Sequence, residues 1–245
     1  MNPIFSKTDK KFNVIILAGG RGTRLKPATE YLAKPLIKLG EERAIDHLIK
    51  KYEHIAHKII IGIGYEADLL ENYIRGKYNK LNIEFSREDP EELHGPGHSL
   101  MFALDHVNSR YPTLITFCDY IVEDVFDVDN DAICVCDKGT ESVLGTYRTI
   151  VEAEEGIAQT LKDNFDEEIE YGFTGIAIFH NTLLLKAITY DYGASTLCLY
   201  AEYEQIIKDY MQNIKTSVIV LNKIYDFGDP KTLEKTRRKL DGHSE

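Results

Sequence analysis

The sequence of 245 residues contains no tryptophan, only four cysteines and no long apolar run. Its longest apolar stretches, such as Val218–Leu221, fall far short of the roughly 20 residues that a membrane-spanning helix needs. The N-terminal segment is polar and charged, and it does not resemble a signal peptide. We therefore expect a protein that is not associated with a membrane.

Positive charge is also scarce, because 29 lysines and arginines stand against 40 aspartates and glutamates. A nucleic-acid-binding surface needs clustered basic residues to neutralise phosphates, so this balance argues against a nucleic-acid partner. Small anionic ligands remain compatible with local basic sites. The four cysteines, Cys118, Cys134, Cys136 and Cys198, form neither a C-x-x-C pair nor a disulfide framework. We expect them to be reduced, which indicates a cytoplasmic protein.

No internal repeat, low-complexity segment or linker divides the chain, so we expect one domain over residues 1–245. Apolar runs and helical periodicity alternate in the first half, which predicts a mostly parallel sheet with helices on both faces. The predicted strands are 14–17, 58–63, 82–85, 113–117, 132–136, 143–147, 157–161, 174–179 and 216–221. The predicted helices are 42–55, 67–77, 100–108, 182–188, 200–212 and 230–240.

A glycine-rich loop over residues 17–25 follows the first predicted strand. Glycines directly after a buried parallel strand let the backbone approach a ligand closely, and exposed N–H groups there favour phosphate oxygens. Arg21 and Arg24 add fixed positive charge with forked donors that suit a polyphosphate. Lys34 follows a proline-containing segment and can return to the same phosphates. The loop therefore predicts a phosphate-binding site.

Two common phosphate-binding motifs do not fit this loop. A dinucleotide fingerprint needs a third glycine that opens a helix, but Leu25 stands at that position and Pro27 interrupts a helix. A Walker A loop needs a G-K-[ST] sequence, which is absent.

The loop resembles the signature of the sugar-phosphate nucleotidylyltransferases. The string LAGGRGTRLKPAT over residues 17–29, followed by Lys34 and Pro35, matches the family pattern L-A-G-G-x-G-T-R-L-x-P-x-T and then K-P. The resemblance runs from about residue 13 to 235. It implies an α/β fold of the nucleotide-diphospho-sugar transferase type, with a Rossmann-like, mainly parallel mixed sheet. It also implies a nucleotide-binding half over about 13–130 and an acceptor-binding half with a tail helix over about 131–240.

The same resemblance implies roles for individual residues. It assigns nucleotide contacts to Leu17, Ala18, Gly19, Gly20, Arg21, Gly22, Thr23 and Gly97, the last within a segment that resembles the glycine loop near the base. It places Lys162 and Gly175 at the acceptor. It implies that Asp119, after a predicted strand, and Asp226, in a D-x-G-D-P segment, bind Mg²⁺. Asp229 precedes Pro230, so we expect it to cap the tail helix instead.

Nucleotidyl transfer from a nucleoside triphosphate needs no general base, because the attacking acceptor phosphate is already an anion. It needs positioning and cations, which Mg²⁺, Arg24 and Lys34 would supply. We therefore assign Arg24 and Lys34 as catalytic residues. With no base required, His94 and His98 are expected to line the base pocket or the surface.

The sequence leaves the substrates open. We expect a pyrimidine triphosphate, with CTP slightly favoured, and a phosphorylated small molecule, most simply a sugar 1-phosphate. A non-sugar acceptor of the phosphocholine type and a catalytically silent nucleotide-sugar sensor are the alternatives, and a homo-oligomer is compatible with the sequence.

Overall fold

The structure is a computed structural model that describes residues 10–89, 91, 95–137, 149–163, 171–194 and 202–242. The predicted strand at 143–147, His94 and Cys198 lie outside these residues. Within the described ranges, no helix has the length and apolar content needed to cross a bilayer.

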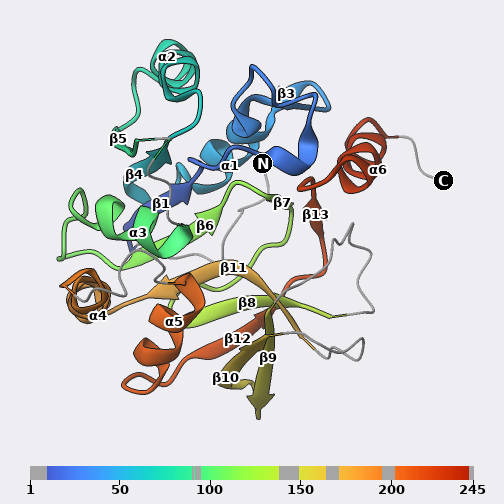
Figure 1. The fold of residues 1–245 in the computed structure, drawn as a ribbon. Coiled ribbons are helices and arrows are strands. Elements are labelled where there is room, and N and C mark those ends of the chain that lie inside the picture. Colours follow the sequence, from blue (N-terminus) through green and yellow to red (C-terminus); the bar gives the residue numbers. More distant parts are fainter. Residues whose placement is uncertain are drawn as a thin grey trace.

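Nine strands form one mixed sheet in the order β5-β4-β1-β6-β11-β8-β12-β10-β9 (Figure 1). The strands are β1 (Phe12–Leu17), β4 (Ala56–Ile63), β5 (Ile83–Arg87), β6 (Thr113–Phe117), β8 (Ala132–Cys136), β9 (Thr149–Glu154), β10 (Ile157–Asp163), β11 (Gly172–Phe179) and β12 (Ser217–Val220). β5, β4, β1 and β6 run parallel, as predicted. Strand β11 is antiparallel to both β6 and β8, and antiparallel pairs predominate from there on.

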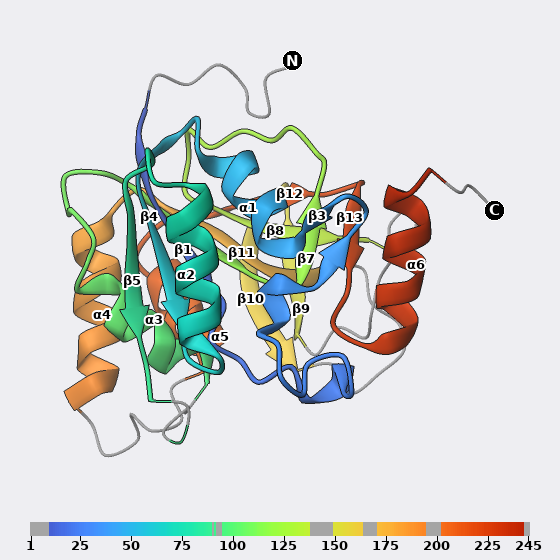
Figure 2. The same ribbon diagram turned by 90° about the horizontal axis from the view of Figure 1, so that it is seen from above.

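Helices cover both faces of the sheet, which confirms the predicted α/β architecture (Figure 2). The helices are α1 (Ala44–Tyr52), α2 (Ala67–Lys77), α3 (Pro96–Leu104), α4 (Thr182–Ala194), α5 (Tyr203–Met211) and α6 (Pro230–Leu240). Residues of α1 and α2 belong to one buried apolar cluster, and residues of α3, α4 and α5 belong to a second one. The sheet therefore separates two cores.

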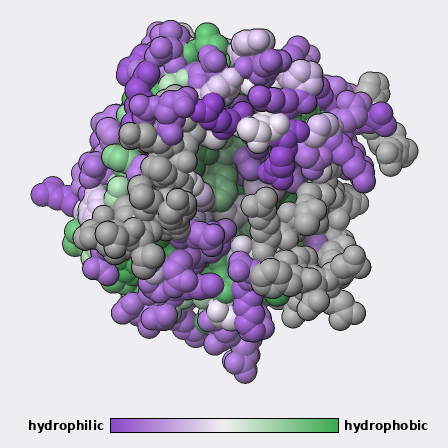
Figure 3. Space-filling model, viewed as in Figure 1, coloured by the Kyte–Doolittle hydropathy of each residue, from purple (hydrophilic) through white to green (hydrophobic). Residues whose placement is uncertain are grey.

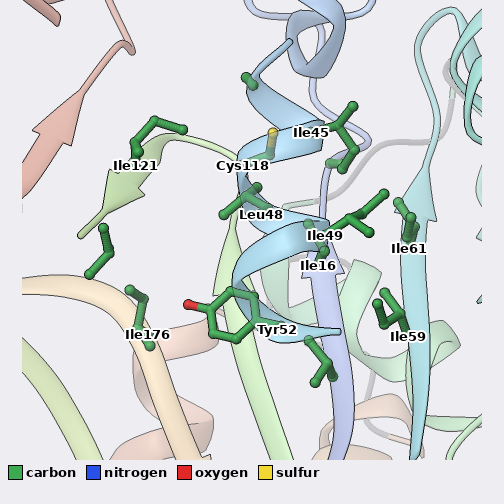
Figure 4. Close-up of a cluster of buried hydrophobic side chains, with 14 of the residues drawn as sticks. Ile16, Ile45, Leu48, Ile49, Tyr52, Ile59, Ile61, Cys118, Ile121 and Ile176 are labelled. Atoms are coloured by element: carbon green, nitrogen blue, oxygen red, sulfur yellow. The ribbon is translucent and has the colours of Figure 1, made fainter. Parts of the chain in front are cut away.

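Strand β1 shows why both faces are buried. Its side chains alternate between the two cores, with Val14 and Ile16 in one cluster and Ile15 and Leu17 in the other. Figure 4 shows the first core, where side chains of α1, including Ile49, lie beside Ile16 of β1. Because residues 14–17 are apolar on both faces of the strand, this part of β1 is buried between two layers of helices.

The parallel register of the sheet brings two loops together. Leu17 at the end of β1 pairs with Gly62 of β4 and with Phe117 of β6. The segments that follow β1 and β6 therefore leave the sheet at the same edge, where ligands bind in open α/β sheets. The face of the molecule seen in Figure 1 is hollowed near its middle, where apolar side chains lie below a largely hydrophilic surface (Figure 3).

Two short sheets and two turns of 3-10 helix complete this edge. β7 (Tyr120–Val122) pairs with β13 (Ile224–Asp226), and β2 (Lys38–Leu39) pairs with β3 (Glu42–Arg43). The 3-10 turns are η1 (Thr23–Leu25) and η2 (Lys34–Leu36). The strands β7 and β13 were not predicted, and α3 begins at Pro96, four residues before the predicted start at residue 100.

Candidate functional site

The glycine-rich loop is held in one conformation by its own backbone. The N–H of Ala18 donates to the carbonyl of Gly62 at 2.9 Å, which extends the pairing of β1 with β4 by one residue. Gly22 adopts a left-handed conformation with φ of 60°, and its carbonyl accepts from the N–H of Leu25 at 2.9 Å and from Oγ1 of Thr29 at 2.8 Å. The turn thus needs glycine at position 22, because side chains are strained at this φ.

Lys34 packs under this loop. A Cβ atom at Gly22 would lie only 3.2 Å from Cβ of Lys34, so the loop and η2 are in close contact. The Lys34 side chain is 10% exposed, and its Nζ donates to Oδ1 of Asp119 at 2.5 Å. Nζ also lies 5.1 Å from the centre of the Phe227 ring. Burial and two partners fix this ammonium group at the floor of the site.

Asp119 and Asp226 come from distant parts of the chain and meet through the short sheet. Asp119 lies between β6 and β7, two residues after the end of β6, while Asp226 is the last residue of β13 and pairs with Tyr120. The N–H of Phe227 donates to the carbonyl of Asp119 at 3.1 Å, which extends this pairing past β13. The structure therefore places together the two carboxylates that the sequence analysis assigned to one metal.

The electrostatics of the two carboxylates favour a bound cation. Burial and then the negative charge of Asp119 raise the pKa of Asp226 to about 6, against the lowering effects of the Gly228 N–H and Lys34. The Gly228 N–H donates to Oδ1 of Asp226 at 2.5 Å. Two neighbouring carboxylates are the donor set that Mg²⁺ needs, since this ion takes one or two carboxylates and completes its shell with phosphates and water. The described residues contain no cluster of three or more His, Cys, Asp or Glu side chains that could hold a metal without such a ligand.

A pocket of about 220 Å³ joins these features. It is lined by Leu17, Ala18, Gly20, Gly22, Thr23, Arg24, Lys34, Pro35, Cys118, Asp119 and Gly228. Arg24 is exposed, and a Cβ atom at Gly228 would lie 3.3 Å from its Nη2 and 3.0 Å from Oδ1 of Asp226. The pocket combines open backbone, a guanidinium, an ammonium and a carboxylate, which is an arrangement suited to a polyphosphate and its metal.

Asp229 has the structural role expected from the sequence. Its side chain accepts from the backbone N–H groups of Lys231 and Thr232 and so caps α6, with Pro230 in the first turn. Burial opposes ionisation, but these hydrogen bonds lower the pKa of Asp229 below its ordinary value.

Three of the residues assigned to the nucleotide, Gly19, Arg21 and Gly97, lie outside the lining of this pocket. The guanidinium of Arg21 pairs with Glu91 at 3.0 Å and lies 5.7 Å from the centre of the Tyr65 ring. Arg21 lines a second pocket of about 660 Å³ with residues 64–68, 87–89 and 91. Gly97 is buried in the first turn of α3.

The two acceptor residues also lie elsewhere. Lys162 on β10 forms an exposed ion pair with Glu152 at 2.5 Å. Gly175 on β11 has φ of 78° and faces the Phe117 ring, which lies two residues before Asp119. Their roles at the acceptor stay predictions.

One residue near the second pocket escaped the sequence analysis. Glu88 directly follows β5, and its side chain is only 2% exposed. In the sequence it stands among the charged residues Arg87, Asp89 and Glu91, which are typical of a solvated loop. Glu88 directly follows a predicted parallel strand that pairs with β4, and this position could have identified it as a candidate site residue.

Comparisons with known proteins identify the family and the fold of this chain. The bifunctional protein GlmU of Methanococcus maripaludis is 32% identical over 115 residues, which cover 47% of this chain and 26% of that protein. The chain thus spans about a quarter of the length of the GlmU proteins that it matches. The structure of a CTP:phosphocholine cytidylyltransferase from Streptococcus pneumoniae superposes with a TM-score of 0.76 at 18% identity, over 94% of this chain and 99% of that one.

A second structure, UDP-glucose pyrophosphorylase in complex with UDP-glucose, has a TM-score of 0.77 at 15% identity and covers 96% of this chain and 100% of that one. These superpositions establish the fold. A family model described as nucleotidyl transferase matches residues 13–241, which is nearly the whole chain, and this chain therefore belongs to the nucleotidyl transferase family.

Proposed function

We propose that the protein transfers a nucleotide from a nucleoside triphosphate to a phosphorylated small molecule and releases pyrophosphate. An oxygen of the acceptor phosphate attacks the α-phosphorus, and the bond from the α-phosphorus to the bridging oxygen of the β-phosphate breaks. The observation that carries this proposal is the ion pair of Lys34 and Asp119 beneath the glycine-rich loop, beside a second carboxylate, Asp226, which is buried.

The residues of the first pocket would have different roles in binding the phosphates. The backbone of the loop and Arg24 would bind the phosphates that leave, because the guanidinium lies at the exposed side of the pocket. Lys34 would hold its ammonium where the α-phosphate and the acceptor phosphate meet, since it is buried beside Asp119. These groups lower the repulsion between two polyanions, which is the main barrier to this reaction.

Asp119 and Asp226 would hold Mg²⁺, because the donor set and the raised pKa of Asp226 fit a hard divalent cation. When bound, Mg²⁺ supplies charge neutralisation for the phosphates. Asp226 is held ready for this role by the Gly228 N–H, which fixes the orientation of its carboxylate.

The proposal also covers the sites for the nucleoside and the acceptor. The second pocket would hold the nucleoside of the triphosphate, and Lys162 and Gly175 would contribute to the binding site of the acceptor. We also propose that the two halves act as one domain, because a single sheet runs through both, and that the protein works in the cytoplasm.

The test is pyrophosphate release in the presence of Mg²⁺, with each of CTP, UTP, dTTP, GTP and ATP. The acceptors are sugar 1-phosphates, as in the UDP-glucose enzyme, and phosphorylated amino alcohols, as in the phosphocholine enzyme. Release with one pair of substrates supports the proposal. Triphosphate binding without release for any acceptor would instead support the nucleotide-sugar sensor.

A further inference from the structure

Glu88 is a buried carboxylate with one unused oxygen. Its Oε2 lies 3.3 Å from Nδ1 of His98, whereas Oε1 has no hydrogen-bond partner among the described residues. The side chain is 2% exposed, so bulk solvent does not reach it. A buried acceptor without a donor is destabilising, and native proteins rarely keep one without a function.

The two nearby arginines, Arg87 and Arg21, pair with carboxylates other than Glu88. Arg87 uses its two terminal nitrogens on Asp68 and Glu71, at 2.8 and 2.7 Å. Arg21 pairs with Glu91 at 3.0 Å. Among the described residues neither arginine donates to Oε1, and a bound ligand can supply the donor.

Glu88 lines the second pocket. Acidic residues outnumber basic ones in its lining, so the negative charge of the pocket disfavours a phosphate group. The acidic residues that line it are Glu66, Asp68, Glu88, Asp89 and Glu91, and the basic ones are Arg21 and Arg87. This lining attracts hydrogen-bond donors and repels anions. The pocket is contiguous in sequence with the phosphate site, because Arg21 lines the second pocket while Gly20 and Gly22 line the first.

The position of His98, which contacts Glu88, also supports a nucleoside as the ligand of this pocket. His98 belongs to the first turn of α3, which begins with the Gly95–Pro96–Gly97 segment. A triphosphate bound along the glycine-rich loop thus extends from the first pocket toward a pocket with an acceptor at Glu88. The part of a nucleotide that carries hydrogen-bond donors on a planar edge is the base.

We propose that Oε1 of Glu88 accepts a hydrogen bond from the exocyclic amino group of the nucleobase, so that the protein selects CTP over UTP. This inference rests on the proposed function, which supplies the nucleotide. Cytosine presents an amino donor at C4, where uracil presents a carbonyl acceptor. A carboxylate can only accept, so uracil bound in the same orientation would set its O4 carbonyl against Oε1 of Glu88.

Calorimetric titration with CTP and with UTP, each in Mg²⁺ and without acceptor, tests this inference. Wild-type protein should bind CTP at least about tenfold more tightly than UTP. Glu88→Gln keeps the shape of the side chain and adds an amide donor that can face the uracil carbonyl, so the ratio of the two dissociation constants should fall at least about tenfold. Glu234→Gln, the same substitution at an exposed site on α6 outside both pockets, is the matched control and should leave the ratio unchanged.

Equal affinity of the wild-type protein for CTP and UTP, or an unchanged ratio in Glu88→Gln, overturns the inference and leaves the proposed function standing. The wild-type ratio decides the matter even where the variant does not fold. Failure to bind any triphosphate overturns the proposed function, and the inference with it.

Discussion

The Nζ atom of Lys34 lies 2.5 Å from Oδ1 of Asp119, although 85 residues of sequence separate them. This ion pair joins the glycine-rich half of the phosphate pocket to the carboxylates of the short β7–β13 sheet. The lysine is the more buried of the two side chains, so its charge is poorly screened by solvent. Positioned charge of this kind is more effective in stabilising a transition state than in binding the ground state.

Lys34→Ala should therefore lower turnover far more than nucleotide affinity. We expect a loss of about 10²–10³ in kcat, by analogy with the removal of one preorganised donor, and a change of less than about tenfold in the dissociation constant of the triphosphate. Steady-state kinetics and calorimetry measure the two. Lys38→Ala, an exposed lysine in β2, is the control and should behave as wild type. Wild-type turnover in Lys34→Ala would contradict the assigned role.

Asp119→Asn and Asp226→Asn should each abolish Mg²⁺-dependent turnover and leave the fold intact. Each amide keeps the size of the carboxylate but removes the charge that a hard cation requires. The measurement is pyrophosphate release against Mg²⁺ concentration, with circular dichroism to check folding. A variant that keeps the wild-type rate and Mg²⁺ dependence would remove that residue from the metal site.

Asp229→Ala should show the opposite behaviour, because Asp229 lies only three residues after Asp226 but caps α6. We expect a loss of about 0.5–2 kcal/mol in the free energy of unfolding, the usual cost of removing such a cap. Denaturant unfolding measures the loss, and the Mg²⁺ dependence of turnover should stay that of the wild type. Unchanged stability would show that the cap contributes little.

Gly175→Ala should destabilise the protein more than Gly156→Ala. Both glycines have a left-handed φ, of 78° and 76°, so both substitutions bear the same strain of about 1–2 kcal/mol. Only at Gly175 would the new Cβ collide with Phe117, at 2.5 Å from Cδ2, which adds about 1–3 kcal/mol of overpacking. Thermal unfolding compares the two variants. Equal melting temperatures would mean that Phe117 moves aside at little cost.

The stability contributed by Asp46 should depend on pH. Burial raises its pKa, but hydrogen bonds from Lys77, Tyr73 and Tyr78 and from the Arg43 N–H outweigh burial and lower it below the ordinary 3.8. The folded state therefore favours the charged form. This stability is present above pH 3.8, the value for the unfolded chain, and is lost as the pH falls through the lower folded value.

Asp46→Asn should accordingly cost about 1–3 kcal/mol at pH 7, and the difference from wild type should shrink as the pH falls below 4. Denaturant unfolding at a series of pH values measures this. Asp68→Asn, whose side chain is 83% exposed, serves as the control. A difference that is constant with pH would contradict the argument.

Elements with strong local signals were predictable from the sequence. The bounds of α2, β6, β8 and α6 agree with the prediction, since each is a continuous apolar run or an amphipathic segment with a clear start, such as Pro230. The strands β7 and β13 were not predictable by these means. Each has three residues, and each exists because it pairs with the other across about 100 residues of sequence.

The direction of the Arg21 side chain was also not predictable, because it depends on a contact with a distant part of the chain. Arg21 belongs to the phosphate loop in sequence, yet its guanidinium turns to Glu91 on a different element. Glu88 was missed because α3 begins at Pro96, where proline is tolerated as the first N–H groups of a helix have no partner. The Gly95–Pro96–Gly97 segment was expected to open a helix, but the contact of His98 with Glu88 depends on how this helix packs beside the end of β5 and leaves no signal in the sequence.

The place of β12 in the sheet has a consequence for biosynthesis. This strand lies between β8 and β10, both of which precede it by more than 50 residues. A nascent chain emerging from the ribosome therefore exposes the edges of β8 and β10 until β12 has been made. Unpaired strand edges are the segments from which aggregation starts, so the interval before residue 220 leaves the exit tunnel is when this protein most needs chaperone protection.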